Sequence, residues 1–161
     1  MVKFKHKGIK IEATAEIRQY SYSDSKSTDK KHFNRTVSVK AEFGDFSIDN
    51  NLYELAMVKS ALQYFMQAYW KRSTKLGTKI DLAMSLEHYK ENGSLQLLNL
   101  SAKQKKNIQS LEVSLTEDGQ QSAPIYLSAQ EVIMLDIAIS KAIALLTPRT
   151  VYIVPKPASK T

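Results

Sequence analysis

The sequence is poor in residues that cross-link a chain, bind metals or cross membranes. It contains no cysteine and three histidines in 161 residues, which excludes a disulfide scaffold, a thiol nucleophile and a cysteine-bound zinc site. No apolar run approaches the ~20 residues of a membrane span, and the first residues, MVKFKHK, lack the apolar stretch of a signal peptide. We therefore expect no metal site, no membrane partner and a cytoplasmic location, in the host cytoplasm if the chain is viral.

The sequence also lacks the local motifs of common enzyme families. It has no P-loop, no GxGxxG, no nucleophile elbow and no HExxH. Asp81, Glu87 and Glu91 could form a metal-dependent nuclease cluster, but such carboxylates are more typical of the solvated face of a strand and its turn. His32 and His88 are likewise more typical of ordinary loop or strand positions. We expect a protein that is not an enzyme, with no catalytic residue and no cofactor.

What the sequence does contain is an excess of positive charge on an otherwise ordinary globular composition. Hydrophobic residues make up 43% and charged residues 24% of the chain, typical of a globular domain with a core. The formal net charge is +7 and the pI about 9.5. This excess favours polyanionic partners, nucleic acid first and anionic membrane second, although many basic proteins use such charge only for solubility.

Two stretches have the residue spacing of amphipathic helices. The first covers residues 49–70, with Asp49 as its candidate cap and no glycine or proline. The second covers residues 128–146, where Ser128 is the candidate cap and Glu131 completes a capping box. Strand-like segments precede both helices, so the caps Asp49 and Ser128 can be aligned. The pattern indicates a β-rich unit that ends in a helix and is repeated once.

Alternation of apolar and polar residues predicts the strands of each unit. The first unit has strands at residues 2–6, 9–20, 36–43 and 46–48, and the second has strands at 82–87 and 94–100 and within 108–127. The polar stretch at 21–34 is predicted to be a long mobile hairpin loop, and 101–107 a basic loop. The Glu91-Asn92-Gly93 sequence predicts a hairpin turn.

These signals predict an α+β fold, a tandem repeat of four antiparallel strands plus one helix with pseudo-two-fold symmetry. We expect a single domain over residues 1–154, made of two ββββα repeats at about 1–72 and 78–147, with a connector at 73–78 and a flexible tail at 155–161. Neither repeat could bury both its sheet face and its helix stripe alone. The residues expected in the shared core are Ile11, Ala13, Ile17, Val39, Leu55, Leu62, Leu86, Val113, Leu135 and Ile139.

Basic and aromatic residues mark a candidate binding surface. They fall on the outward side of the strands or at the margins of the predicted loops. Cations neutralise phosphates and unpaired bases stack on aromatic rings, so this mixture suits a single-stranded polynucleotide. The alternative interpretation is a mixed solvated strand face shielded by tyrosines. The candidate nucleic-acid-binding residues are Lys10, Arg18, Tyr20, Tyr22, Lys30, Lys31, Phe33, Arg35, Lys40, Tyr89, Lys90 and Lys103.

The order of elements resembles the Whirly fold, which the trypanosome guide-RNA-binding proteins share and to which dimeric positive cofactor four is similar. The Tyr126-Leu127-Ser128-Ala129-Gln130-Glu131 sequence, followed by Leu135, looks like the Leu-Ser-x-x-Glu junction of plant Whirly proteins. Lys7-Gly8 is similar to the start of their Lys-Gly-Lys-Ala motif, from which Ile9 departs. The resemblance implies sequence-tolerant binding of single-stranded DNA or RNA along sheet surfaces and edges, and assembly into tetramers.

The leading hypothesis is therefore a non-enzymatic single-stranded nucleic-acid-binding protein. We expect it to bind single-stranded DNA, or RNA, in replication or recombination, in a bacteriophage or a bacterium, and to form a homotetramer. One alternative is a structural or assembly protein that joins other protomers through exposed sheet edges. Another is a transcription regulator that reads duplex grooves, although no helix-turn-helix signature is present.

Overall fold

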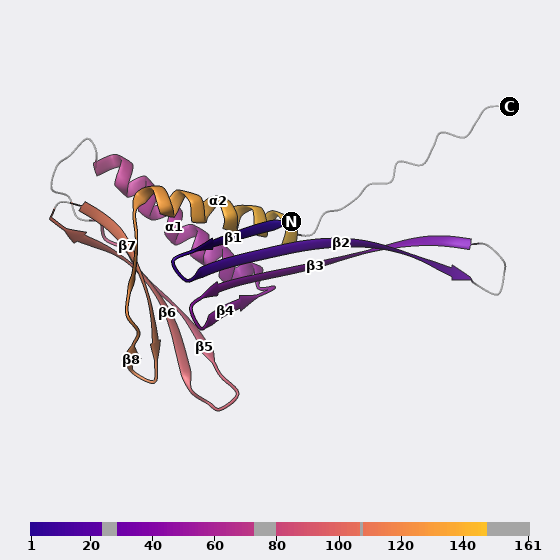
Figure 1. Ribbon diagram of the computed structural model, residues 1–161, viewed down its shortest axis with the longest axis horizontal. Helices are drawn as coiled ribbons and strands as arrows, with labels where there is room; N and C mark the ends of the chain where they lie inside the picture. The colour runs from indigo at the N-terminus through magenta and orange to yellow at the C-terminus, as the bar shows by residue number, and fades with distance from the viewer. Residues whose placement is uncertain (24–28, 73–79, 107, 148–161) are drawn as a thin grey trace.

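The structure, a computed structural model, has an α+β architecture of two antiparallel sheets and two helices (Figure 1). It describes residues 1–23, 29–72, 80–106 and 108–147, and for residues 17–23, 29–35 and 72 it describes the backbone alone. The predicted connector at 73–78 and tail at 155–161 lie outside these ranges. Within them, neither helix is both long and apolar enough to cross a membrane.

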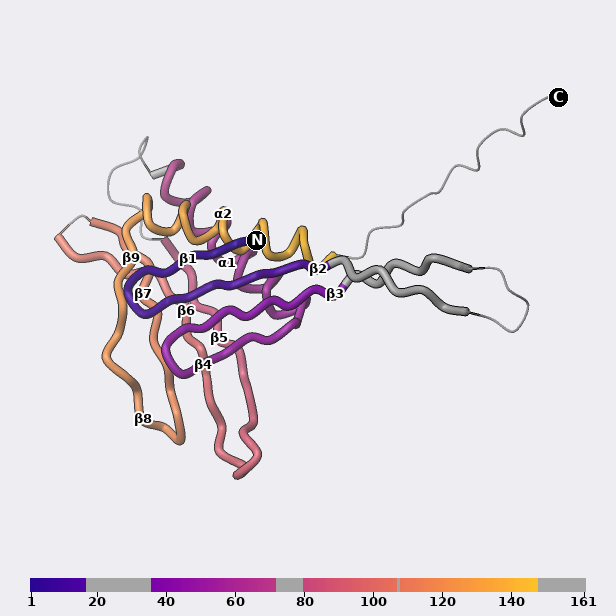
Figure 2. Tube along the Cα trace, turned by 45° about the vertical axis from the view of Figure 1, so that its right-hand side comes forward, coloured from indigo at the N-terminus to yellow at the C-terminus, as the bar shows by residue number. Residues whose placement is uncertain are grey.

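The first sheet contains four strands that pair antiparallel in chain order, and Figure 2 shows them side by side. Helix α1 (Leu52–Arg72) follows them. The strands are β1 (Val2–His6), β2 (Ile9–Ser23), β3 (Asp29–Phe43) and β4 (Phe46–Asp49).

The second sheet has the order β5-β6-β7-β8, and β9 also pairs with β7. Its strands are β5 (Ala83–Tyr89), β6 (Leu95–Lys105), β7 (Ile108–Glu117), β8 (Gln120–Gln121) and β9 (Ile125–Leu127), followed by helix α2 (Ala129–Leu146). The single last strand expected from the sequence is thus divided in two. Pro124 lies between the two pieces and has no N–H to donate to a ladder, so the second half has five strands where four were expected.

Two predicted loops were wrong because the strand pairing continues through them. In the 21–34 stretch, β2 extends to Ser23 and β3 begins at Asp29. In the 101–107 stretch, β6 extends to Lys105 and pairs with β7 as far as Ile108. Strand pairing uses the backbone N–H and C=O groups, so it can continue through residues with polar and basic side chains.

The cap predicted for α1 was also wrong. Asp49 ends β4, and Asn50 has a left-handed φ of 50°, so the helix cannot begin before the next residue. Asn51 is the cap, because its Oδ1 accepts the backbone N–H of Glu54 at 3.1 Å. For α2 the prediction is confirmed: Ser128 and Glu131 form a complete capping box.

One continuous core joins the two sheets and the two helices. Of the predicted core residues, Ile11, Ala13, Val39, Leu55, Leu62, Leu86, Val113, Leu135 and Ile139 are buried, which confirms those assignments. The side chain of Ile17 lies outside the described part of the structure. Helix α2 packs across β1, β2 and β3 and also touches β7 and β9, so the helix of the second half covers the sheet of the first.

Two histidine–glutamate pairs connect the halves reciprocally. His6 in β1 hydrogen-bonds to Glu131 in the first turn of α2. His88 in β5 hydrogen-bonds to Glu54 in the first turn of α1 at 2.5 Å, and its ring stacks on Phe46 with 4.1 Å between centroids. In each case the first strand of one half holds the N-terminal end of the other half's helix, where a carboxylate is favoured by the helix dipole.

The carboxylate of Glu131 receives more hydrogen bonds than that of Glu54. Burial alone would raise its pKa, but hydrogen bonds from the Ser128 backbone, His6, Lys7 and the Ser128 hydroxyl outweigh burial and lower the pKa to about 2. Lys7 lies 3.0 Å from Oε1 of Glu131 and also donates to the Tyr126 carbonyl oxygen. These bonds place the β1–β2 turn on the start of α2.

We expect Glu131→Gln to lower the free energy of unfolding at pH 7 by about 1–3 kcal/mol. Because the pKa of Glu131 is lower in the folded chain than in the unfolded chain, its ionised form stabilises the fold at pH values above about 4.5, its unfolded pKa. This stabilisation is lost as the pH falls toward 2, its folded pKa. Urea denaturation from pH 7 down to pH 3 should therefore show the variant and the parent converging.

The control for this experiment is Glu117→Gln, which removes an exposed carboxylate that hydrogen-bonds to Lys90. Exposed pairs contribute about 0–1 kcal/mol, so this change should have a small effect at every pH. A Glu131→Gln penalty that stays constant with pH would contradict the role given to the charge.

Candidate nucleic-acid interface

A two-stranded ribbon extends from the first sheet and is formed by residues 14–23 of β2 and 29–38 of β3. The two strands pair from Ile9 and Phe43 out to Ser23 and Asp29. Strand β1 pairs with β2 only as far as Ala13, and β4 pairs with β3 only from Lys40 onward. Among the described residues, the ten cross-strand pairs from Thr14–Ser38 to Ser23–Asp29 therefore have no third strand, and β2 and β3 continue past their neighbours (Figure 1).

Seven of the candidate residues lie on this ribbon. Its register pairs Arg18 with Asn34, Tyr20 with His32 and Tyr22 with Lys30, and at the intervening positions Arg35, Phe33 and Lys31 pair with Ile17, Gln19 and Ser21. Their side chains lie outside the described part of the structure. The backbone nevertheless places cationic and aromatic residues close in sequence on two paired strands.

The candidate cations of the main body are in a different situation, because each has a carboxylate partner. The Nζ atoms of Lys10 and Lys40 lie 3.2 and 3.1 Å from Glu12 and Glu42. Lys90 lies 2.5 Å from Glu117, and Lys103 lies 3.9 Å from Glu112. The hydrogen bonds to Glu42 and Glu117 raise the pKa values of Lys40 and Lys90 respectively. A phosphate must compete with these carboxylates.

The outward face of the first sheet carries both lysines and carboxylates. In one row across the sheet, Lys3 pairs with Glu12, Glu12 with Lys40, and Lys40 with Asp49. Lys3 and Lys5 are exposed cations of β1 outside the candidate set, although their alternation with Val2 and Phe4 would have identified them. In another row, Lys5 pairs with Lys10 and Lys10 with Glu42. Because carboxylates lie among the cations in both rows, this face is not a continuous track for phosphates.

Tyr89 and Lys90 are separated from the ribbon. Tyr89 ends β5 with 73% of its surface exposed, and Lys90 begins the hairpin turn, where its N–H donates to the Ser94 carbonyl oxygen. This turn points away from the body in a different direction from β2 and β3 in both views (Figures 1 and 2). The structure thus divides the candidate residues into a ribbon group and a body group.

The positive charge of the chain is concentrated in three segments. Residues 17–35 carry five basic and two acidic residues, while residues 72–79 and 148–161 each carry three basic residues and no acidic residue. The remainder of the chain carries twelve basic and fourteen acidic residues. The whole excess of +7 therefore comes from residues 17–35, most of which lie on the ribbon, from residues 72–79, which run from the end of α1 toward β5, and from residues 148–161 after α2.

The described residues contain no group of three His, Cys, Asp or Glu side chains placed to hold a metal ion. Asp81, Glu87 and Glu91 are exposed, and His88 is engaged with Glu54 and Phe46.

No protein-family model and no curated protein matches the chain. Among solved structures, it is similar to the crystal structure of WHY1 from Arabidopsis thaliana, with a TM-score of 0.40 and 7% sequence identity over 89% of this chain and 82% of that chain. A likeness at this level establishes neither a common ancestor nor a common ligand.

Proposed function

We propose that this protein binds single-stranded nucleic acid, single-stranded DNA or RNA, without sequence preference and without catalysis. The observation that supports the proposal most directly is the distribution of charge. The main body has slightly more acidic than basic residues, so the whole positive excess lies on the ribbon and two further segments. Such an arrangement attracts a polyanion to these segments, where several cations can release counterions together.

In this mechanism, binding has two stages. Cations of the ribbon first capture the phosphate backbone, and unpaired bases then stack on nearby rings. Lys30, Lys31 and Arg35 serve the first stage, and Tyr20 and Tyr22 the second. Single strands are preferred over duplex because only unpaired bases expose their faces to a ring.

We place this activity in replication or recombination, where single strands are exposed, in the cytoplasm of a bacterium or of a bacteriophage host. The protein would protect or present the strand without altering it. A titration of labelled oligonucleotides, single-stranded against duplex at two salt concentrations, tests the proposal as a whole. Equal competition by duplex would overturn it in favour of binding by charge alone.

We also propose that residues 1–154 form one domain of two related halves, about 1–72 and 78–147, around an approximate two-fold axis. The reciprocal pairs His6–Glu131 and His88–Glu54 support this, because each joins the first strand of one half to the helix of the other. The Asn51-x-x-Glu54 and Ser128-x-x-Glu131 caps occupy corresponding places.

Neutralising ribbon cations should weaken binding to all single strands alike. For Lys30→Gln combined with Arg35→Gln, we expect the log–log salt dependence to flatten by about 0.7 for each phosphate that is no longer neutralised. The matched control is Lys141→Gln, an exposed cation of α2 outside the ribbon. Lys10→Gln and Lys40→Gln should have smaller effects than the ribbon variants, because both side chains already contact carboxylates. Equal effects from ribbon and control variants, measured by fluorescence anisotropy, would contradict the ribbon's role.

Removing the stacking rings should leave the salt dependence nearly unchanged. Alanine at Tyr20, Tyr22 or Tyr89 should cost about 1–3 kcal/mol of binding free energy per stacked base, since stacking releases no counterions. Tyr126→Ala is the control, because Tyr126 on β9 is 50% exposed and lies outside the ribbon. If the three variants bind as tightly as the parent, bases stack elsewhere or not at all.

We propose that the protein self-associates through its helices, as the tetramer suggested by the Whirly resemblance. Met134 and Ile137 lie three residues apart on α2 and are 53% and 50% exposed, so they form an apolar surface that another protomer could cover. Light scattering should report an oligomer for the parent and a smaller species for Met134→Glu with Ile137→Glu. A parent that is monomeric at micromolar concentration would refute this assembly.

A further inference from the structure

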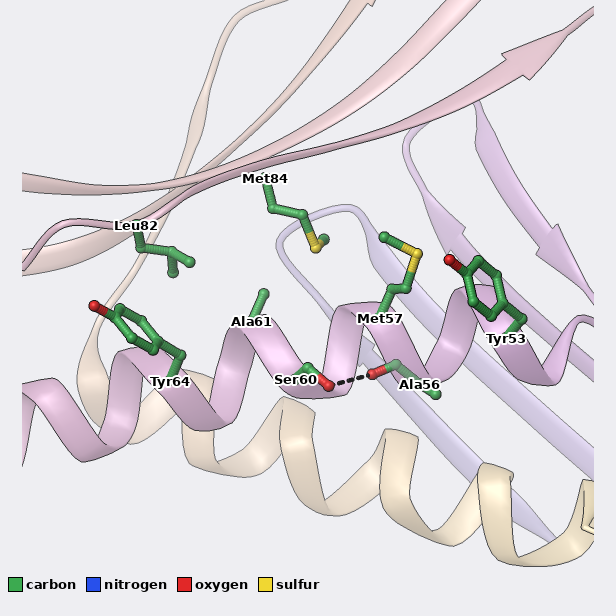
Figure 3. A pocket seen from close by; sticks show the side chains of 8 residues that line it. All are labelled: Tyr53, Ala56, Met57, Ser60, Ala61, Tyr64, Leu82 and Met84. Carbon is green, nitrogen blue, oxygen red and sulfur yellow. Dashed lines mark hydrogen bonds between the residues drawn. The ribbon is translucent and has the colours of Figure 1, made fainter.

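An apolar groove of about 470 Å³ lies between α1 and the beginning of β5. Helix α1 contributes Tyr53, Met57 and Tyr64, and Leu82 and Met84 face them from the other side (Figure 3). The hydroxyl of Ser60 donates to the Ala56 carbonyl oxygen at 2.9 Å, so it is already engaged within the helix. The groove therefore suits an apolar occupant better than a polar one.

The groove borders an open sheet edge. Within the described residues, β5 pairs with β6 along one side and with no strand along the other. Leu86 is buried, whereas Tyr53 and Tyr64 on the helix below remain 72% and 49% exposed. One more strand beside β5 would extend the sheet over this part of α1 and satisfy the free backbone groups of the edge.

The chain itself supplies a segment with the required character. Val151-Tyr152-Ile153-Val154 is a run of four residues that favour strands, bounded by Pro148 and Pro155. Of the segments outside the described ranges, 24–28, 73–79, 107 and 148–161, only the last contains such a run. We propose that residues 151–154 pair with the free edge of β5 and insert alternate side chains into the groove.

The direction and reach of the chain are compatible with this site. Helices α1 and α2 run antiparallel (Figure 1), so α2 ends where α1 begins, at the Tyr53 end of the groove. Strand β5 runs the opposite way to α1, since His88 contacts Glu54 while Leu82 lies beside Tyr64. A segment that enters from α2 would thus run antiparallel to β5. The four residues from Thr147 to Val151 can span up to ~13 Å, which matches the 10–12 Å width of a helix.

The charges on either side of the segment complement those around β5. Asp81, Glu87 and Glu91 are exposed around the strand, and Lys90, the one basic residue among positions 80–91, is held by Glu117. The segment carries Arg149 before it and Lys156 and Lys160 after it. Docking would bring cations next to these carboxylates and give the contact a preferred position.

Cysteine cross-linking in the full chain tests the proposal, because the natural sequence has no cysteine. Glu87→Cys, at an exposed position of β5 next to His88, combined with Tyr152→Cys should be joined by a short bismaleimide about tenfold faster than Gln120→Cys combined with Tyr152→Cys, since docking raises the local concentration. Gln120 is exposed on β8, at the other side of the same sheet. Products linked within one chain identify the protein's own segment as the occupant, and linked dimers identify that of a second copy. Both results support the site, whereas equal rates for the two pairs overturn it.

Hydrogen exchange provides a second measurement that needs no cross-linker. Ile153→Asp should place a charge in the apolar groove, release the segment and speed exchange of the β5 amides about tenfold or more, while the β6–β7 ladder stays protected. Ser159→Asp, beyond Pro157, is the matched control and should leave β5 unchanged. If Ile153→Asp also leaves β5 exchange unchanged, the segment does not cover this edge.

Discussion

The burial of two apolar sheet faces against two helices in one shared core is the constraint on which the rest of the structure depends. Each sheet has one apolar side, and neither could be covered by its own half alone. Helix α2 lies across the first sheet, and α1 lies beside β5 of the second. Each histidine–glutamate pair joins the first turn of one helix to the first strand of the other half.

This arrangement also determines where a ligand can bind. With both helices and both inner sheet faces committed to the core, the groups left for recognition are on outer faces, edges and extensions. On the outer face of the first sheet, Lys10 contacts Glu12 within β2 and Lys40 contacts Glu42 within β3, so these cations are already paired with carboxylates. Among the described residues, the ribbon has no neighbouring strand beyond Ala13 and Lys40. Because the ribbon extends beyond the neighbouring strands, it holds a positively charged region away from the main body, where basic and acidic residues nearly balance.

Sequence patterns were most reliable where side chains face a core. Period-two alternation identified Ile11, Ala13 and Val39, and the helical spacing identified Leu62 and Leu135, all of which are buried. These patterns are strong because a one-residue shift would move every apolar side chain into water. The patterns were weak in the 21–34 stretch, which is rich in polar and basic residues although the backbone of residues 21–23 and 29–34 is paired as strands.

The sequence by itself determined the α+β class, the position of α2 and its capping box, most of the core and the absence of cysteine chemistry. Each of these depends on residue type or on local spacing. Only the tertiary structure decided that Asn51 replaces Asp49 as a cap, that Lys10, Lys40, Lys90 and Lys103 have carboxylate partners, and that Tyr89 lies apart from the ribbon. The contacts of Lys90 and Lys103 depend on which strands become neighbours, and strand pairing joins residues far apart in the chain whose distances no local pattern encodes. The cap and the contacts of Lys10 and Lys40 join residues only two or three apart, but they depend on backbone angles and side-chain directions that residue type alone does not determine.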